Sequence, residues 1–449
     1  MNLIDKLGIK SSRTKNISKH VLLSAIFKGS SILLSFLLVP LTINFLNPTN
    51  YGIWLVITSF ISWFTFFDIG LGHGLRNKFA TAKANGDFKL AKAYISSAYF
   101  SIAFISFSIL LLFIIANLFI DWTIIFNTDK EMLQDLSSIM LLVFGNFCIQ
   151  FILKLITTIY TADQRPSMQG LIGVSTQALS LLTIFLLSRY SSSSLLIFSV
   201  IFTSIPVLVL LAFNFYSFNN KYKDLKPSFK LFKLKYVKDI MGIGFNFFII
   251  QIAAIILFST DNIIITQLFS PEEVTPYNIA FKYFSIVTMG FSIIVTPYWS
   301  AITEAYTKKD FSWIKKSINT LLKLSIIFSL GAIVLIIFSN EFYFFWVGDL
   351  IQVPFTLSLF MGIYAIMRVF GLPFNHFING TGKIKFQLYF AIFGAVMNIP
   401  LSIYFAKHLE LGISGIMLAT IACDFIGLII LPIQYNKIIN NKAHGIWNR

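Results

Sequence analysis

The chain has 449 residues, of which 56% are hydrophobic and only 12% are charged, and this composition excludes an ordinary soluble protein. Nearly continuous apolar runs also exclude a transmembrane β-barrel, whose strands alternate apolar and polar side chains. The formal net charge of +16 does not indicate a nucleic-acid partner, because a membrane protein retains Lys and Arg in its cytoplasmic loops. The sequence therefore predicts an all-α polytopic membrane protein that binds no nucleic acid.

Taken in chain order, the apolar runs predict twelve transmembrane helices, each of roughly the 20 residues or more that a bilayer requires. The first run lacks a small-residue cleavage site and is long for a signal peptide, so we expect it to remain as a span. The spans are 20–46, 51–74, 94–120, 137–162, 167–187, 195–216, 240–268, 277–303, 318–339, 353–378, 386–406 and 413–434.

Positive charge is distributed unevenly over the loops between these spans. Of the 35 Lys and Arg residues, most lie in the two tails and in every second loop. The opposite loops hold only Lys130, Arg189 and Lys407, so both termini are predicted to be cytoplasmic. The opposite loops are also too short to fold as a domain, which argues against an enzyme that acts outside the membrane.

The longest inner loop, residues 217–239, divides the chain into two halves of six spans each, 20–216 and 240–434. Two tails, 1–19 and 435–449, flank the halves. The loop carries seven lysines, which we expect to lie on anionic lipid headgroups; a specific regulatory partner is the alternative.

The two halves share turn residues at matched positions. Pro48 and Tyr51 open the second span, as Pro271 and Tyr277 open the eighth, and an Asp-Phe pair follows the next span in both halves. Six is an even number, so both halves enter the membrane from the same side and the repeat is parallel. Such halves form two six-helix bundles around a central cavity in many transporters. Chance recurrence of common turn residues is the alternative.

Five basic side chains lie inside the predicted spans. An ionisable group at bilayer depth costs roughly 2.5–3.5 kcal/mol, so by default it faces a cavity. Lys323 is close enough to a span end to reach the inner surface, and the same explanation competes with a cavity role for Lys282. Lys28, Lys154 and Arg368 lie deeper and are predicted to face a cavity. The alternative is a buried ion pair with Asp68, Asp261 or Asp424.

Several stretches resemble one family of bacterial membrane proteins. Residues 51–54 (Tyr-Gly-Ile-Trp), 67–72 (Phe-Asp-Ile-Gly-Leu-Gly) and 76–78 (Arg-Asn-Lys) look like the second span and following loop of O-antigen and capsule repeat-unit flippases. The Pro48 opening and the turn 379–383 are similar to that family too. The likeness covers essentially the whole chain. These flippases are the polysaccharide transporter branch of the multidrug/oligosaccharidyl-lipid/polysaccharide exporter superfamily.

The resemblance implies a V-shaped pair of bundles that opens to each side of the bacterial plasma (inner) membrane in turn. The implied cargo is an undecaprenyl-diphosphate-linked oligosaccharide repeat unit, moved from the inner to the outer leaflet for O-antigen, capsule or exopolysaccharide assembly. A polysaccharide polymerase and the chain-length machinery are the protein partners that it suggests.

Buried cations suit such a cargo because a diphosphate carries about two negative charges. Arg donates two parallel hydrogen bonds to phosphate oxygens, and Lys offers a compact charge. Flippases of this group use basic cavity residues on the first and eighth spans, where Lys28 and Lys282 lie here. The predicted substrate-binding residues are Lys28, Lys154, Lys282 and Arg368. A cation-coupled multidrug exporter of the same superfamily is the alternative, but an acidic cavity would suit organic cations better.

Transport is a candidate for coupling to H⁺ or Na⁺, because a buried carboxylate binds a proton and carboxylate and amide oxygens ligate Na⁺. Some relatives place a sodium site among spans seven, eleven and twelve. Asp261, Asn398 and Asp424 are the corresponding candidates, with Thr420 beside them; salt bridges to the lysines are the alternative. No metal-ligand spacing joins the histidines and no ATP-binding loop occurs, so no cofactor is expected.

Two kinds of residue are candidates for bending during opening and closing. Pro40 and Pro297 lie deep in spans one and eight and would kink their helices. Asp68, Gly70 and Gly72 indicate a break at the inner end of span two. Kinks that serve packing alone are the alternative.

Overall fold

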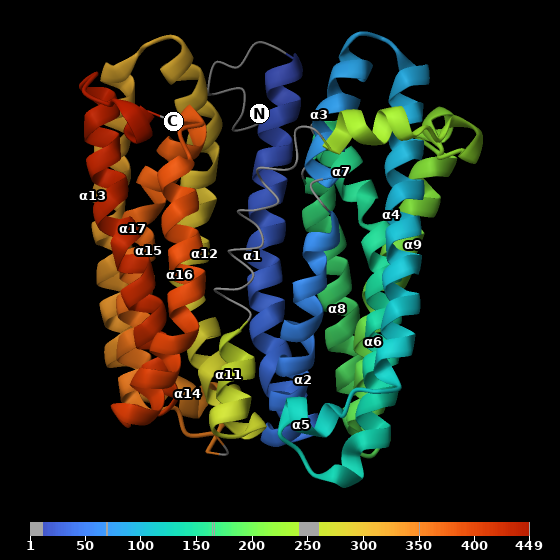
Figure 1. The fold of residues 1–449 in the computed structure, drawn as a ribbon, viewed down its shortest axis with the longest axis vertical. Coiled ribbons are helices and arrows are strands. Elements are labelled where there is room, and N and C mark those ends of the chain that lie inside the picture. The colour runs from blue at the N-terminus through green and yellow to red at the C-terminus, as the bar shows by residue number, and fades with distance from the viewer. Residues whose placement is uncertain are drawn as a thin grey trace, which may run out of the picture. The chain divides into compact units, whose positions relative to one another are not determined.

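The computed structural model describes residues 12–68, 71–163, 165, 167–241, 260–349 and 351–448. The chain forms two compact units. Unit 1 comprises Met1–Asn50 and Phe60–Gln251, and unit 2 comprises Tyr51–Ser59 and Ile252–Arg449. Each unit is built from helices, several of which are labelled in Figure 1.

In the first half of the chain the described helices begin at Ser12. They are α1 (Ser12–Leu46), α2 (Pro48–Ser62), α3 (Leu71–Ala84), α4 (Phe88–Asn117), α5 (Trp122–Phe126), α6 (Leu133–Leu153), α7 (Leu155–Ala162), α8 (Ser167–Tyr190) and α9 (Leu195–Asn219). In the second half they are α11 (Asp261–Leu268), α12 (Pro271–Thr307), α13 (Phe311–Ile337), α14 (Ser339–Val347), α15 (Phe355–Thr381), α16 (Lys385–Ile403) and α17 (Ile413–Ile439).

Ten helical stretches in the described part of the chain are long and apolar enough to cross a membrane. The prediction of an all-α, multi-pass membrane protein is therefore confirmed. Most of the predicted seventh span, 240–268, lies outside the described residues, and its last part forms α11.

The predicted second span, 51–74, differs from a single continuous helix. The α-helix α2 ends at Ser62, and a 3₁₀ helix follows over Trp63–Asp68. Helix α3 then runs to Ala84, through residues that the charge pattern assigned to a loop. It is amphipathic, with Leu75, Phe79 and Ala82 buried on one face and Arg76 exposed. Packing of the buried face on α4 and α7 within unit 1 keeps this polar stretch helical.

Helices that hold equivalent places in the two halves begin at equivalent caps. The Asn47 side chain accepts a hydrogen bond from the Asn50 backbone at the start of α2 (2.9 Å), and Ser270 accepts one from the Glu273 backbone at the start of α12 (3.4 Å). Asp87 and Asp310 cap α4 and α13 in the same way. Such caps satisfy backbone N–H groups that have no partner inside the helix.

The order of packing is also the same in the two units. In unit 1, α4 packs on α6, α6 on α9, and α8 on both α1 and α9. In unit 2, α13 packs on α15, α15 on α17, and α16 on both α11 and α17. The orange and red helices of unit 2 lie side by side in Figure 1. Helices at equivalent positions in the chain thus have equivalent neighbours, which supports the parallel repeat.

The segment 217–239, expected to link the halves, packs on α4 within unit 1. The Ser228 and Lys233 backbones donate hydrogen bonds to the buried Ser96 and Ser97 hydroxyls (3.0 and 3.3 Å). Tyr94 meets Tyr236 edge to face with ring centroids 5.3 Å apart. These contacts place the segment in unit 1.

The segment that follows α9 also reaches the turn between α7 and α8, where it forms the first turn cluster (Lys83, Asp163, Lys221 and Tyr222). Lys83 and Lys221 both pair with the Asp163 carboxylate, and the Tyr222 hydroxyl donates to it at 2.7 Å. Burial alone would raise the pKa of Asp163, but the hydrogen bonds from Lys221, Lys83 and Tyr222 outweigh it and lower the pKa.

The segment that follows α17 forms a second turn cluster (Lys383, Gln434, Lys437, Trp447 and Asn448) over the turn between α15 and α16. Asn448 accepts a hydrogen bond from the Lys383 ammonium, and the Gln434 amide donates to the Lys383 and Trp447 carbonyls. The Lys437 ammonium lies 3.7 Å from the centre of the Trp447 ring. In both units, then, the chain beyond the last helix returns to the same turn.

Candidate functional site

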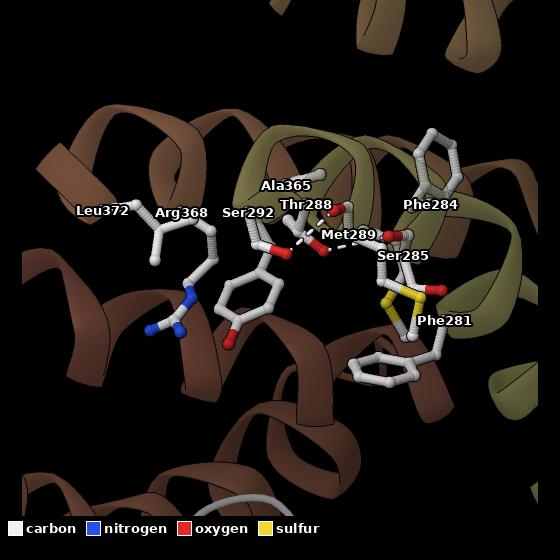
Figure 2. A pocket seen from close by; sticks show the side chains of 11 residues that line it. Phe281, Phe284, Ser285, Thr288, Met289, Ser292, Ala365, Arg368 and Leu372 are labelled. Carbon is white, nitrogen blue, oxygen red and sulfur yellow. Dashed lines mark hydrogen bonds between the residues drawn. The ribbon is translucent and has the colours of Figure 1, made fainter. Parts of the chain in front are cut away.

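A cavity of about 340 Å³ lies inside unit 2, between α12 and α15. Its wall follows from helical spacing, because residues three or four positions apart share one face of a helix. From α12 the lining residues are Phe281, Phe284, Ser285, Thr288, Met289 and Ser292, and from α15 they are Met361, Tyr364, Ala365, Arg368 and Leu372 (Figure 2). The cavity is thus mostly apolar, with a few polar groups on one wall and a single cation.

The α12 wall presents a row of hydroxyl groups. Ser285, Thr288 and Ser292 donate to carbonyls of their own helix at 2.7, 3.1 and 2.8 Å. Dashed lines in Figure 2 mark hydrogen bonds among the residues drawn there. A hydroxyl that has donated its hydrogen keeps lone pairs that accept from a ligand. The wall therefore offers acceptors in an apolar setting.

Arg368 lies at the other side of the drawn cavity, on α15, and is partly exposed (Figure 2). Its Nη1 atom lies 3.6 Å from Oδ2 of Asp424 on α17, which is ion-pair distance but too long for a strong hydrogen bond. Tyr364, one helical turn before Arg368, interacts with both charged groups. Arg368 and Asp424 also line a smaller cavity of about 50 Å³ between α15 and α17.

A third cavity, also of about 50 Å³, adjoins the first through Phe281 and Tyr364, which line both. Asp261 and Thr420 line it from α11 and α17. The Tyr277 hydroxyl donates to Oδ2 of the buried Asp261 at 2.7 Å. Within the described part of the chain, Oδ1 of Asp261 has no hydrogen-bond partner.

Asn398, fully buried on α16, joins Asp261 and Thr420 in a polar group. Its amide nitrogen donates to the Thr420 hydroxyl at 3.0 Å, and among the described residues its carbonyl oxygen has no partner. Buried polar atoms are nearly always paired, so two unpaired acceptor oxygens beside a hydroxyl are chemically suited to a proton or a small hard cation. No three His, Cys, Asp or Glu side chains in the described ranges are placed to hold a metal ion together.

The structure brings some of the predicted site residues together and places others apart from them. It brings Asp261, Thr420 and Asn398 together, whereas Asp424, one turn beyond Thr420, pairs with Arg368. Lys282 is on α12 but does not line the cavity described above. Lys28 on α1 and Lys154 between α6 and α7 belong to unit 1, and both side chains are exposed.

The helices continue through or end near the residues predicted to bend. Pro40 lies within α1, and α12 runs through position 297. Asp68 is the last residue of the 3₁₀ helix, Gly72 lies in α3, and Gly70 lies outside the described residues. Their part in opening and closing stays a prediction.

Sequence reasoning missed several polar residues of the site. Tyr364 stands four residues before Arg368, so helical spacing places it on the same face as the predicted cation. The hydroxyl residues 285, 288 and 292 repeat at helical spacing, which indicates a shared polar face on their own helix. Tyr277 was noted only as a turn residue. Its contact with Asp261 depends on how α11 packs on α12, which spacing alone does not give.

Comparison with known proteins identifies relatives over most of the chain. A family model described as polysaccharide biosynthesis protein matches residues 17–303, and one described as MatE matches residues 247–404. A Salmonella typhimurium protein named as an O-antigen transporter is 24% identical over 84% of this chain and 86% of its own. A Yersinia pseudotuberculosis protein named as an O-antigen export protein is 23% identical over 90% of this chain and 93% of its own length.

Solved structures share the fold. The inward-facing conformation of a multidrug resistance MATE family transporter of the MOP superfamily is similar with a TM-score of 0.74 and 12% identity, over 94% of this chain and 98% of that one. At this identity the likeness concerns architecture alone.

Proposed function

Because this chain belongs to the polysaccharide biosynthesis protein family, we propose that it carries lipid-linked oligosaccharide repeat units across the bacterial plasma membrane. It moves them from the inner to the outer leaflet by alternating access, for O-antigen, capsule or exopolysaccharide assembly. Both termini lie in the cytoplasm, and the lysines of 217–239 lie against anionic lipids. The polysaccharide polymerase and the chain-length machinery receive the cargo.

The chain is a multi-pass membrane transporter and not an enzyme, as the sequence predicted. The proposed step is therefore binding and release of an intact lipid-linked sugar. What needs a physical explanation is how a diphosphate headgroup enters a region of hydrocarbon.

The observation that supports the proposal most is Arg368 at the cavity between α12 and α15. A guanidinium placed in a membrane span is costly unless it has a partner or a ligand. Its planar group of five N–H donors matches two phosphate oxygens at once. The apolar remainder of the cavity wall excludes water, so an anion held there interacts with the cation more strongly than it would in solution.

Asp424 acts in this proposal as the counter-ion of the unloaded state. At 3.6 Å it balances the charge of Arg368 without a short hydrogen bond. A diphosphate that approaches Arg368 offers more acceptor oxygens and more charge than one carboxylate, so it displaces Asp424. The exchange keeps the Arg368 cation paired both before and after loading, and the displaced Asp424 carboxylate keeps its hydrogen bond to Tyr364.

Ion coupling belongs to the Asp261, Asn398 and Thr420 group in this proposal. Binding of H⁺ or Na⁺ at their oxygens changes the charge beside Tyr364, which also interacts with Arg368 and Asp424. Tyr364 thus connects the ion group with the anion-binding pair. Lys28, Lys154 and Lys282 add positive charge along the path of the cargo.

The test is transport by the Arg368→Gln variant, reconstituted into liposomes with a lipid-linked oligosaccharide. We expect transport to fall roughly 10- to 100-fold, the loss expected for a hydrogen bond to a charged group. Lys323→Gln is the matched control, because Lys323 is an exposed cation on α13 that lines no cavity described here. Arg368→Lys should retain part of the activity, since charge remains but bidentate donation is lost.

If equal amounts of the Arg368→Gln variant and the wild type are reconstituted and both transport at the same rate, the proposed role of Arg368 is wrong. A wild-type protein that exports cationic drugs and moves no lipid-linked sugar would instead establish the multidrug alternative.

A further inference from the structure

The segment 217–239 has an inner side that belongs to the core of unit 1 and an outer side that is exposed. Leu225 and Val237 are part of a buried core that also contains residues of α4. By contrast, Phe229 and Leu234 are 72% and 67% exposed. The yellow-green ribbon of this segment runs across the upright helices in Figure 1, and its two 3₁₀ helices pack on α4. The segment is therefore fixed to unit 1 with two large apolar side chains directed outward.

Contacts with α4 fix the depth of these two apolar side chains. The Phe229 ring meets the Phe100 ring edge to face, with centroids 5.2 Å apart. Lys233, the residue before Leu234, donates its backbone N–H to the Ser97 hydroxyl at 3.3 Å. Positions 97 and 100 follow the predicted start of the third span at 94, by about 5 and about 9 Å along an α-helix. Both apolar side chains therefore lie at the level where the acyl chains of the inner leaflet begin.

The face of α4 on which Phe229 packs is the face that meets lipid. Phe104, Phe107 and Leu111 follow Phe100 at helical spacing and are 73%, 61% and 46% exposed. Exposed apolar side chains along a membrane span contact acyl chains, which are as apolar as they are. Phe229 extends this lipid-facing stripe at its inner end, so its exposed ring faces the membrane and not the cytoplasm.

Lysines flank Phe229 on both sides in the chain. The segment 217–239 carries seven lysines and two aspartates. Lys221 pairs with Asp163, whereas no carboxylate of the described residues lies within ion-pair distance of the other six lysines. Exposed ammonium groups at the cytoplasmic leaflet are attracted to the phosphates of anionic lipids. The six are Lys223, Lys226, Lys230, Lys233, Lys235 and Lys238, all of them exposed.

We propose that the segment 217–239 is an inserted lipid-binding site. Phe229 and Leu234 enter the acyl region of the inner leaflet, and the six exposed lysines bind the phosphate groups of anionic phospholipids around them. The inference rests on the proposed function, which places this segment on the cytoplasmic side, and it adds insertion to attraction at the surface. Apolar insertion combined with a basic patch holds a protein to a membrane stably, whereas one weak signal alone binds reversibly. Unit 1 thereby keeps a fixed depth in the inner leaflet.

The first measurement is the depth of position 229 in the full-length protein, reconstituted into vesicles of phosphatidylcholine and phosphatidylglycerol. A nitroxide is attached to Phe229→Cys; Cys148 and Cys423 are buried, so labelling is selective. Relative access of oxygen and of an aqueous nickel complex to the label reports its depth. We expect the label about 5–10 Å below the phosphates. Asp224→Cys, at an exposed position of the same segment, is the control and should be in water. Equal access of nickel to both labels would overturn the insertion.

The second measurement is the preference of the detergent-solubilised protein for phosphatidylglycerol over phosphatidylcholine, by native mass spectrometry. A triple variant with Gln at the lysines of the segment should lose about fivefold in preference for each lysine removed. The control triple variant removes the same charge from α13 and the turn before it and should keep the preference. Equal losses in the two variants, or displacement of phosphatidylglycerol by glycerol 3-phosphate, would overturn the lipid site. The first variant carries Lys226→Gln, Lys230→Gln and Lys233→Gln, and the control carries Lys309→Gln, Lys315→Gln and Lys316→Gln, all at exposed positions.

Both measurements are made without cargo, so they separate this inference from the proposed function. Arg368→Gln should keep the depth of position 229 and the preference for phosphatidylglycerol while failing to move lipid-linked oligosaccharide. An inserted, lipid-selective protein that transports no lipid-linked sugar overturns only the proposed function. Transport by a protein whose position 229 lies in water overturns only the inserted lipid-binding site.

Discussion

Asp261 illustrates how the surroundings of one side chain limit what it can do. One of its oxygens accepts from Tyr277 at 2.7 Å, and the other has no partner among the described residues. A carboxylate paired on one side only, inside a span, can take up a proton or a cation and release it again. That property distinguishes it from Asp424, whose neighbour is a permanent cation.

Replacement of Asp261 by Asn should therefore uncouple transport from the ion gradient without abolishing cargo binding. The amide keeps the size of the side chain and an acceptor for Tyr277 but binds no proton and carries no charge. In liposomes with an imposed H⁺ or Na⁺ gradient, the variant should transport at the rate that the wild type shows without a gradient. Asp129→Asn, outside the spans, is the control. A variant that still responds to the gradient like the wild type would exclude Asp261 as the coupling site.

The sequence predicts which charged residues lie in the spans better than it predicts which residues are their ion-pair partners. A cation inside an apolar run is visible in the sequence, and Lys28, Lys154, Lys282 and Arg368 were predicted in that way. The partner of a cation is set by how the helices are rotated about their axes. An apolar run does not define that rotation, because most of its faces are hydrophobic. Hence the sequence left several partners open for Arg368, and the helix packing places Asp424 beside it.

At the scale of elements, the close approach of α2 to the start of α12 depends on a glycine. Gly52 on α2 faces the first turn of α12, and a Cβ atom at this position would lie 1.8 Å from the Pro271 carbonyl oxygen. That oxygen is part of the backbone and cannot move without shifting the start of α12. Gly29 on α1 offers a contrast, because a Cβ atom there would meet nothing within 4 Å.

Gly52→Ala should lower stability by about 1–3 kcal/mol, the range for a group forced into a packed interior. Gly29→Ala should be neutral or stabilising by up to about 1 kcal/mol, since Ala favours the helix. Thermal melting of the two purified variants in the same detergent measures the difference. Equal melting temperatures would show that α2 and α12 are not in contact at Gly52.

The same elements show where sequence analysis of the fold succeeded and where it failed. Long apolar runs located ten spans because hydrophobic length alone determines them. The run after span two was assigned to a loop because Arg76, Lys78 and Lys83 dominated the composition. The apolar positions 75, 79 and 82 at helical spacing were the missed signal for α3.

At the scale of the whole molecule, the repeat extends beyond the spans to the segments that follow the last helix of each unit. The first turn cluster ties α3, the α7–α8 turn and the segment after α9 to one carboxylate, Asp163, which is only 7% exposed. Arg165 adds a more distant contact at 3.7 Å. Loss of that carboxylate would leave several cations facing one another.

Asp163→Asn should destabilise unit 1 by about 1–2 kcal/mol at neutral pH, less than a fully buried pair because Lys83 and Lys221 are about one-third exposed. The effect depends on pH because the folded state lowers the pKa of this carboxyl. Its stabilisation is complete above the ordinary carboxyl pKa of about 3.9 and is lost as pH falls through the lower folded-state pKa.

Melting temperatures of the wild type and of Asp163→Asn should therefore differ at pH 7 and converge in acid. Asp224→Asn removes an exposed carboxylate from the same segment and serves as the control. A constant difference at every pH would mean that the variant acts through packing and not through charge.

The two turn clusters are built from different forces, and this has a consequence for the way the halves respond to their surroundings. The first depends on attraction between full charges near the surface, which dissolved ions screen over distances of about 10 Å at 0.1 M ionic strength. The second depends on an indole ring, an amide and the Lys437 ammonium, and Phe386 lies 4.3 Å from that ring. A rise in salt concentration should consequently weaken the first cluster more than the second, so the segments that close the two halves differ in their response to the ionic composition of the medium.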